Sequence, residues 1–249
     1  MKRIQLNSKN LKLGTIEAKV QFNAAANGQT DLYLHGDVGE SWWDDSGITA
    51  KKVIAALDEI ETDTVNVHIN TYGGDVFEGI SIFNVLRASE KKIVTIVDGI
   101  AASAGSLIFL AGDQKKMPDN TQLMIHNPWT YASGNANDLE KVVDMLRTTE
   151  SAMTKTYMES FVGTEEEIKE LLDSEKFMTA EEAKTFGFVD EIITKEPEDA
   201  SANAQATIAE RLMAKYGGMF NEPKQEKTKN RSNPLQNFMN IFEEETKNV

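Results

Sequence analysis

The chain has 249 residues, enough for one substantial core, so we expect one domain followed by a tail. Its formal net charge of −14 argues against nucleic acid or an anionic membrane as a partner, because both bind through clustered Lys and Arg. It contains no cysteine, which excludes disulfides, a thiolate nucleophile and cysteine-ligated metal. The longest apolar stretch, near residues 100–111, is too short to span a bilayer, and no signal peptide is visible, so we expect a soluble protein.

The first 64 residues predict short strands and one helix. Residues 1–30 alternate weakly between polar and apolar, which suggests edge strands, and residues 31–35 predict a further strand. The loop that follows contains Trp42-Trp43, for which half-buried packing over the sheet edge is favoured over an exposed binding platform. A helix is expected after residues 48–49, with one apolar face formed by Val53, Ile54, Leu57 and Ile60.

A second strand and helix enclose a pair of glycines. Residues 65–70 alternate cleanly and predict a strand, and Gly73-Gly74 follows its carboxyl end. Adjacent glycines let backbone N–H groups approach a ligand, because no Cβ stands in the way. A phosphate-binding loop is set aside, since no G-K-[ST] follows. The next helix is expected to bury a stripe formed by Phe77, Ile80, Phe83 and Leu86.

The segment from Asp98 to Gly112 organises the chain. The β-branched run 93–97 predicts a strand and the apolar residues 107–110 predict a helix, with Ser103 at the turn between them. Only small residues surround Ser103, as a sharp strand-to-helix corner with an exposed hydroxyl requires. The unpaired N–H groups of the helix start could hold an oxyanion there. Taken alone, the stretch fits an alanine-rich tight turn at least as well.

The second half of the chain is expected to be mainly helical. A core strand over residues 121–125 ends at His126, and a long helix capped by Asp138 runs to about residue 161. Capping boxes at Thr164 and Thr179 begin two shorter helices. Gly187 ends the second of these, before a last strand over residues 188–193. From residue 196 the composition is that of a helical or disordered tail.

Three of these features follow the carboxyl ends of predicted strands. Strand, turn and helix in series imply a parallel sheet, whose ligand sites lie at the carboxyl ends of its strands. Gly73-Gly74, Ser103 and His126 would meet there and supply backbone donors, a nucleophile and a base for acyl transfer. His35 and His68 fit surface or neighbour-satisfied roles better. On spacing alone, a structural role for His126 stays as open as a catalytic one.

Four motifs occur in order and together resemble the Clp-type serine endopeptidases. They are I-N-T-Y-G-G-D-V-F-E-G at 69–79, D-G-I-A-A-S-A-G-S at 98–106, M-I-H-N-P-W at 124–129 and F-M-T-A-E-E-A-K-T-F-G-F-V-D-E-I at 177–192. The likeness is greatest to the Clp-like head maturation (prohead) proteases of tailed bacteriophages. The resemblance implies an α/β, crotonase-like fold of repeated β-β-α units with a protruding long helix, in a domain spanning residues 31–195. Residues 1–30 would then form an N-terminal edge segment and residues 196–249 a tail.

The resemblance also assigns site residues by position. Ser103 would be the nucleophile and His126 the general base, and the N–H groups of Gly74 and Ala104 would form the oxyanion hole. The position of the family's acidic residue falls on Glu175, whose extra methylene puts its reach to the imidazole in question.

Asp173 is the alternative acid, and a solvated charge on a loop is the competing interpretation of either carboxylate. Gly73 and Asn127 are expected to contact the substrate. No cofactor or metal is expected.

The implied function is ATP-independent cleavage of scaffold or capsid proteins during phage head maturation, in the host cytoplasm and inside the procapsid. The resemblance implies a homo-oligomer, commonly a heptameric ring or double ring. Three alternatives stay open: a bacterial Clp proteolytic subunit served by an unfoldase ATPase, an acyl-CoA enzyme on the same fold, and an inactive structural component of the procapsid.

Overall fold

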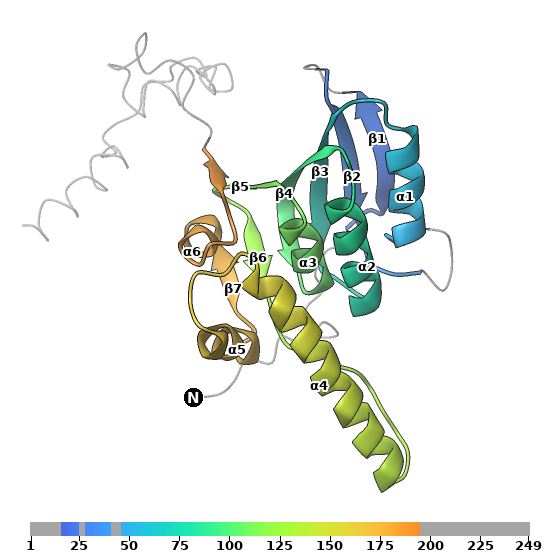
Figure 1. Cartoon of the computed structure of the whole chain (residues 1–249), viewed down its shortest axis with the longest axis vertical. Coiled ribbons are helices and arrows are strands. Elements are labelled where there is room, and N and C mark those ends of the chain that lie inside the picture. Colours follow the sequence, from blue (N-terminus) through green and yellow to red (C-terminus); the bar gives the residue numbers. More distant parts are fainter. Residues whose placement is uncertain (1–15, 25–27, 41–45, 195–249) are drawn as a thin grey trace, which may run out of the picture. The chain divides into compact units, whose positions relative to one another are not determined.

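A computed structural model describes residues 16–24, 28–40 and 46–194 of the chain (Figure 1). Trp42-Trp43 and the predicted tail from residue 196 lie outside the described residues, as does most of the predicted N-terminal segment. The described part is a mixed α/β structure, as expected, in which helices cover a multi-stranded sheet. The finer prediction of crotonase-like β-β-α repeats stays a prediction.

The sheet has eight strands and is largely parallel. Its main order is β1-β2-β3-β4-β5-β8, and β6 joins it by pairing with β4 and with β7. Only β1 with β2 and β6 with β7 run antiparallel, so the predicted parallel core is confirmed. The strands are β1 (Lys19–Ala24), β2 (Thr30–His35), β3 (Thr64–Thr71), β4 (Lys92–Ala102), β5 (Gln114–Pro118), β6 (Gln122–Met124), β7 (Phe177–Thr179) and β8 (Glu191–Ile193).

The long strand β4 changes partners along its length. Its first half, Val94–Ile96, pairs with β5, and its last residues, Ile100–Ala102, pair with β6. On its other side a register shift lets Thr71 of β3 pair with Ala101. The carboxyl ends of β3, β4 and β6 therefore lie side by side, and each is followed by one of the three predicted site segments.

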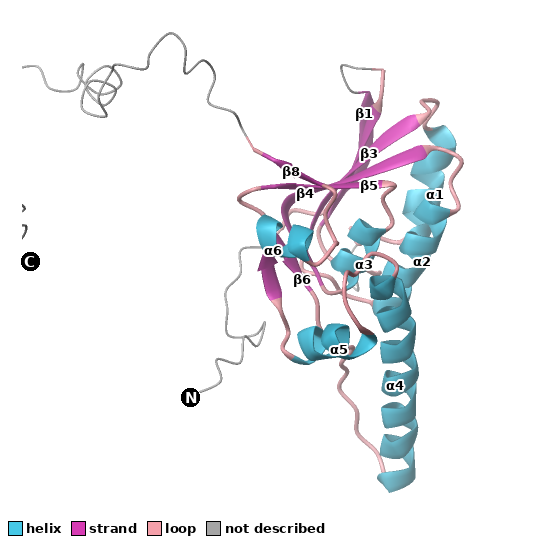
Figure 2. Ribbon diagram, turned by 60° about the vertical axis from the view of Figure 1, so that its left-hand side comes forward, coloured by secondary structure: helices cyan, strands magenta, loops and turns pink. Residues whose placement is uncertain are grey.

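Three helices cover one face of this sheet and a fourth projects away from it (Figures 1 and 2). The covering helices are α1 (Ala50–Glu59), α2 (Val76–Arg87) and α3 (Ala104–Leu110), and the projecting helix is α4 (Ala136–Met158). The short helices α5 (Glu165–Asp173) and α6 (Ala180–Thr185) follow it. In the described residues, no helix combines the length and apolar character needed to cross a membrane.

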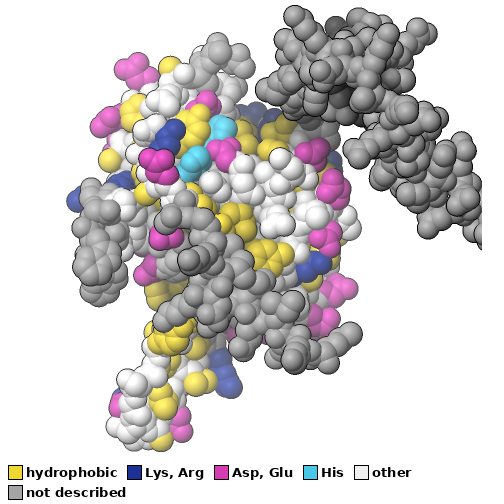
Figure 3. Space-filling model, turned by 180° about the vertical axis from the view of Figure 1, so that it is seen from behind, with side chains coloured by type: hydrophobic (Ala, Val, Ile, Leu, Met, Phe, Trp, Pro, Cys, Tyr) yellow, Lys and Arg dark blue, Asp and Glu magenta, His cyan; other side chains and the backbone are white. Residues whose placement is uncertain are grey.

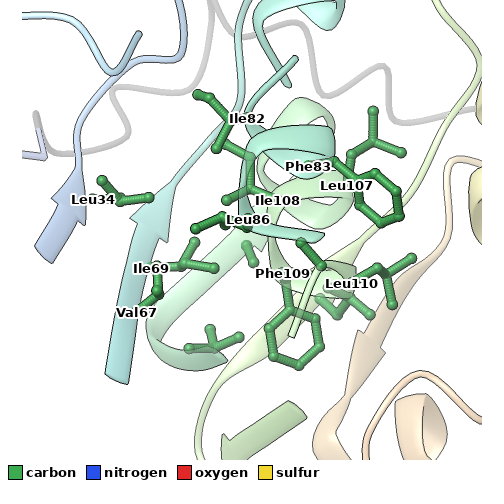
Figure 4. Close-up of a cluster of buried hydrophobic side chains, with 14 of the residues drawn as sticks. Leu34, Val67, Ile69, Ile82, Phe83, Leu86, Leu107, Ile108, Phe109 and Leu110 are labelled. Carbon is green, nitrogen blue, oxygen red and sulfur yellow. The ribbon is translucent and has the colours of Figure 1, made fainter. Parts of the chain in front are cut away.

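Strand alternation decides which face is buried. In β3 the residues Val65, Val67, Ile69 and Thr71 are buried beneath the helices, and the residues between them face the other side. A strand places successive side chains on opposite faces, so the alternating sequence puts apolar side chains under the helices and polar ones on the other face. Figure 4 shows the resulting core, where Leu34 and Ile69 from the strands meet Ile82, Leu107 and Phe109 from the helices.

Several predicted details are confirmed. Thr164 and Thr179 begin α5 and α6 with reciprocal capping boxes, each closed by a glutamate three residues later. Gly187, at φ +87°, ends the short helix as expected. The long helix is present, with its buried residues near its carboxyl end.

Other details are wrong. Asn135, and not Asp138, caps α4. The Asn135 side chain accepts a hydrogen bond from the Asp138 N–H, and the Asp138 carboxylate accepts one from the Asn135 N–H. Ile54 and Phe77 are largely exposed although their spacing predicted burial. Strands β5 and β7 were not predicted, and the last strand spans only Glu191–Ile193.

Phe109 and Phe77 test this account of the core. Phe109 is fully buried and Phe77 is 58% exposed. We expect Phe109→Ala to lower the free energy of unfolding by about 3–5 kcal/mol, through lost apolar burial and the cavity that remains. Phe77→Ala, the matched control, should cost less than about 1 kcal/mol. Urea titration of both variants measures the difference, and equal losses would contradict the assignment.

Candidate active site

Ser103 stands at the corner between β4 and α3 in a strained backbone conformation. Its φ is 54° and its ψ is −124°, a combination rare for a residue with a side chain. The corner is fixed on both sides, since the Ser103 N–H donates to Met124 O at 2.9 Å and its carbonyl accepts from the Ser106 N–H at 2.9 Å. The side chain makes no capping bond to α3. Its hydroxyl is thereby available to a neighbouring group.

That neighbour is His126. The imidazole Nε2 lies 2.7 Å from Ser103 Oγ, a hydrogen-bond distance. His126 reaches this position because β6 pairs with the end of β4. Ile125, which lies between β6 and His126, is fixed because its N–H donates to Lys176 O at 3.1 Å. The structure thus brings together two side chains that are 23 residues apart in the sequence.

Two opposing effects act on the pKa of His126. Burial of the ring, the larger effect, lowers the pKa below its usual value because a buried imidazolium loses hydration. The negative charge of Glu175 acts in the opposite direction and raises the pKa. The net result is a lowered pKa, so the ring is neutral at pH 7 and one nitrogen can accept a proton.

Glu175 lies just beyond the end of α5 in a left-handed conformation, with φ at 50°. Its N–H donates to Leu172 O at 3.1 Å and the Lys176 N–H donates to Leu171 O at 3.4 Å. This is the Schellman ending, where glycine is usual because a Cβ is disfavoured there. A glutamate at this position therefore adds local strain and directs a charge toward the imidazole.

The alternative acid has a different partner. Asp173 Oδ1 accepts a hydrogen bond of 2.6 Å from Asn127 Nδ2. Of the two carboxylates, Glu175 is the one whose charge acts on His126. Within the described part of the chain, no hydrogen bond joins Glu175 to the ring, and Asn127 Oδ1 is buried without a partner.

The glycine pair lies against the Ser103 corner. A Cβ at Gly73 would lie 2.7 Å from Ser103 Cβ and 3.0 Å from Ala104 N, and a Cβ at Gly74 would lie 2.0 Å from Val38 O. Both residues have positive φ, 97° and 150°. Only glycine fits this close contact. The Gly73 N–H is already bonded to Thr71 Oγ1, and its carbonyl accepts from the Val38 N–H.

Two N–H groups beside Ser103 have no acceptor among the described residues. They belong to Gly74 and to Ala104, the first residue of α3. An unpaired N–H at a helix start favours negative charge. With a hydroxyl and a neutral imidazole in contact next to them, the arrangement provides the groups that acyl transfer requires.

The other two histidines lie on the face of the sheet away from α1 and α2, where Figure 3 shows histidine side chains beside acidic ones. His35 Nε2 lies 2.9 Å from Asp98 Oδ2, and His68 Nδ1 lies 2.7 Å from Asp98 Oδ1. Tyr33 stacks on His68 with ring centroids 4.8 Å apart. The predicted neighbour-satisfied role fits both histidines. Sequence reasoning missed Asp98 as their shared partner.

The two imidazoles hold the pKa of Asp98 at about 2, although burial, the largest single effect, acts to raise it. Hydrogen bonds and positive charge from His35 and His68 together outweigh the lost hydration.

Among the described residues, no group of three or more His, Asp or Glu side chains is arranged to hold a metal ion.

Comparison with known protein families shows what the chain is similar to. The model of the family described as Clp protease matches residues 39–196, well over half of the chain. The matched region begins after β2 and contains Gly73-Gly74, Ser103, Ala104, His126 and Glu175.

Asp98 gives a test in acid. A carboxylate with a depressed pKa stabilises the fold when the pH is above the pKa that it has in the unfolded chain, near 3.8. That contribution is lost as the pH falls through its pKa in the folded protein, about 2. Between pH 5 and pH 2 we expect the free energy of unfolding of the wild type to fall by about 1–2 kcal/mol more than that of Asp98→Asn. Asp144→Asn, which removes an exposed carboxylate on α4, should follow the wild type. Parallel curves for all three proteins would contradict the assignment.

Proposed function

The chain belongs to the Clp protease family and is a Clp-type peptidase, and we propose that it is an ATP-independent serine endopeptidase with Ser103 as nucleophile and His126 as general base. One observation carries the proposal. The imidazole Nε2 lies 2.7 Å from the hydroxyl of a serine held in a strained strand-to-helix corner. A histidine with a purely structural role does not require a strained serine as its partner, whereas a serine nucleophile requires a base within hydrogen-bond reach.

The first half of the reaction forms an acyl-enzyme. As Ser103 Oγ attacks the scissile carbonyl carbon, its proton passes to His126 Nε2, which requires that Nδ1 carries the other proton. The carbonyl oxygen becomes an oxyanion, and the unpaired N–H groups of Gly74 and Ala104 are proposed to bind it. When the tetrahedral intermediate collapses, the peptide C–N bond breaks and His126 gives its proton to the leaving amine.

The second half releases the acyl group. Water enters in place of the amine and loses a proton to His126 Nε2 as its oxygen attacks the ester carbonyl. The second tetrahedral intermediate collapses, and Ser103 leaves with the proton that His126 returns. Substrate and water are consumed, two peptides form, and the protein needs no cofactor for either half.

Glu175 is proposed as the acidic residue of the site. Its charge stabilises the imidazolium that forms in both halves of the reaction, as its effect on the pKa of His126 indicates. In the structure its carboxylate makes no hydrogen bond to the ring within the described residues. We propose that it closes onto Nδ1 when substrate fills the site.

The substrates are proposed to be extended polypeptides that add as a strand beside the glycine loop. Gly73 contributes by having no side chain there, and its N–H is already bonded to Thr71 Oγ1. Asn127 follows the base directly and is proposed to contact the substrate. Its Oδ1 is buried without a partner in the described structure.

The biological role is proposed to be cleavage of scaffold or capsid proteins during phage head assembly, in the host cytoplasm and inside the procapsid. This rests on the sequence features nearest the phage proteases, namely Trp42-Trp43, G-D-V-F-E-G at 74–79 and H-N-P-W at 126–129.

We also propose a homo-oligomeric ring, of the heptameric or double-ring kind. Apolar side chains on the projecting helix α4 and the loop before it are exposed in the single chain, including Trp129, Tyr131, Leu139 and Val143. Exposed apolar surface of this kind is typical of an interface between subunits.

Labelling and cleavage test the proposed chemistry. We expect a fluorophosphonate to modify the wild type stoichiometrically at Ser103 and to leave Ser103→Ala unmodified, because only a base-activated hydroxyl reacts. Wild type incubated with candidate scaffold and capsid proteins should give defined fragments by mass spectrometry, and Ser103→Ala should give none. Ser174→Ala, which changes an exposed serine at the end of α5, is the matched control and should behave as the wild type does.

The outcomes separate the alternatives. Identical fragments from wild type and Ser103→Ala would remove Ser103 from the mechanism. No labelling at all would favour an inactive structural protein. Degradation of a folded, tagged substrate only when an unfoldase ATPase is added would favour the bacterial proteolytic subunit.

Glu175→Gln tests the acidic residue through the pH profile. Removing the negative charge removes an effect that raises the pKa of His126, so that pKa should fall further. The acid limb of kcat/KM for a peptide substrate should therefore move to lower pH. At the same time kcat should fall by about 10²–10⁴-fold, because the imidazolium loses its partner.

Asp173→Asn is the matched control, because its carboxylate bonds to Asn127 and not to the imidazole. Its acid limb should coincide with that of the wild type. If Asp173→Asn shifts the limb and Glu175→Gln does not, the two acids have been assigned the wrong way round.

A further inference from the structure

A buried pair of hydroxyls lies directly behind the Ser103 corner. Ser106 Oγ donates to the Ser103 carbonyl oxygen at 2.6 Å and lies 2.7 Å from Tyr157 Oη. Both Ser106 and Tyr157 have 0% exposure, although each carries a hydroxyl. Buried hydroxyls are costly unless they are bonded, so this contact is a specific feature of the core.

The direction of the hydrogen bonds follows from the groups themselves. A carbonyl oxygen only accepts, so the single proton of Ser106 Oγ is used on Ser103 O. Tyr157 must then donate its own proton to Ser106 Oγ. The result is a chain in which the phenol of α4 donates to a hydroxyl of α3, and that hydroxyl donates to the carbonyl of Ser103.

Tyr157 is suited to be a permanent donor. Its ring lies against Phe188 with centroids 6.2 Å apart, and Phe161 stacks on Phe188 at 5.7 Å, so the phenol is fixed in an aromatic cluster. Burial raises the pKa of Tyr157 well above its ordinary value, which keeps its proton in place at neutral pH.

The carbonyl that receives this chain belongs to the most strained residue of the site. A conformation such as that of Ser103 costs on the order of 1–3 kcal/mol and persists only where its surroundings fix it. The Ser103 carbonyl has two donors, the Ser106 N–H at 2.9 Å and the Ser106 hydroxyl at 2.6 Å. The first is a backbone bond that the first turn of the helix forms whatever side chain residue 106 has. The second exists only because residue 106 is serine.

We infer that Ser106 and Tyr157 are positioning residues, which hold the Ser103 carbonyl and thereby keep the nucleophile hydroxyl aligned with His126. Neither residue touches the substrate or the reacting atoms. The inference rests on the proposed role of Ser103 and adds to it a connection from the long helix α4 to the nucleophile.

Tyr157→Phe removes one hydroxyl and leaves the ring. We expect kcat for a peptide substrate to fall about tenfold while KM changes little, because misalignment of a nucleophile affects the chemical step more than binding. The rate of fluorophosphonate reaction at Ser103 should fall by a similar factor. The acid limb of the pH profile should stay in place, since His126 keeps its surroundings.

Ser106→Ala removes the bond to the carbonyl and should lower kcat at least as much. Since Tyr157 acts only through Ser106, the double variant should have the kcat of Ser106→Ala, with no further loss. Thr154→Val is the matched control. It removes a buried hydroxyl from the same helix, one that has no hydrogen-bond partner within the described residues, so kcat should equal that of the wild type. Thermal unfolding checks that each variant is folded.

The outcomes distinguish this inference from the proposed function. An active wild type with unchanged kcat in Tyr157→Phe and Ser106→Ala would overturn the positioning role alone. Losses that multiply in the double variant would also overturn it, because they would show independent effects. A wild type that neither cleaves peptides nor reacts with fluorophosphonate would overturn the proposed function and this inference together.

Discussion

The site depends on one constraint in the sheet, the change of partner along β4. The first half of this strand pairs with β5 and its last three residues pair with β6, so β6 is positioned by the end of β4 rather than by its middle. His126 follows β6 and Ser103 follows β4, which puts Nε2 and Oγ 2.7 Å apart. The register shift between β3 and β4 brings Gly73-Gly74 to the same edge. Parallel pairing alone would align the strands without making their ends coincide.

Strain and burial at this edge are balanced by specific contacts. Ser103 and Glu175 are the two non-glycine residues with positive φ in the described part of the chain, and both belong to the site. Ser103 is fixed by bonds from its N–H and to its carbonyl, and Glu175 by the ending of α5. Burial lowers the pKa of His126, which keeps the ring neutral, while Glu175 limits the shift and would stabilise the charged ring during catalysis.

Much of this architecture could be predicted from the sequence, because it is encoded locally. The alternation of residues 65–70, the small residues around Ser103 and the capping boxes at Thr164 and Thr179 each specify a structure without distant contacts. The family of the chain could be recognised as well, from motifs in a fixed order.

The rest could not be predicted, because it depends on partners far away in the chain. Strand β7 has three residues and exists only through its pairing with β6. Phe77 has the spacing of a core residue, but no element of the described part of the chain covers it. The hydrogen bond from Asn127 to Asp173 and the effect of the Glu175 charge on His126 depend on how α5 ends. The contact between the hydroxyls of Ser106 and Tyr157 forms only because α3 and α4 meet.

A crystal structure of the protein after reaction with a fluorophosphonate tests the central claim most directly. The phosphorus stands in for the tetrahedral carbon, and one of its oxygens for the oxyanion. We predict a covalent bond from Ser103 Oγ to phosphorus, with that oxygen about 2.7–3.1 Å from the nitrogens of both Gly74 and Ala104. An adduct on any other residue, or an oxygen directed away from both N–H groups, would contradict the account.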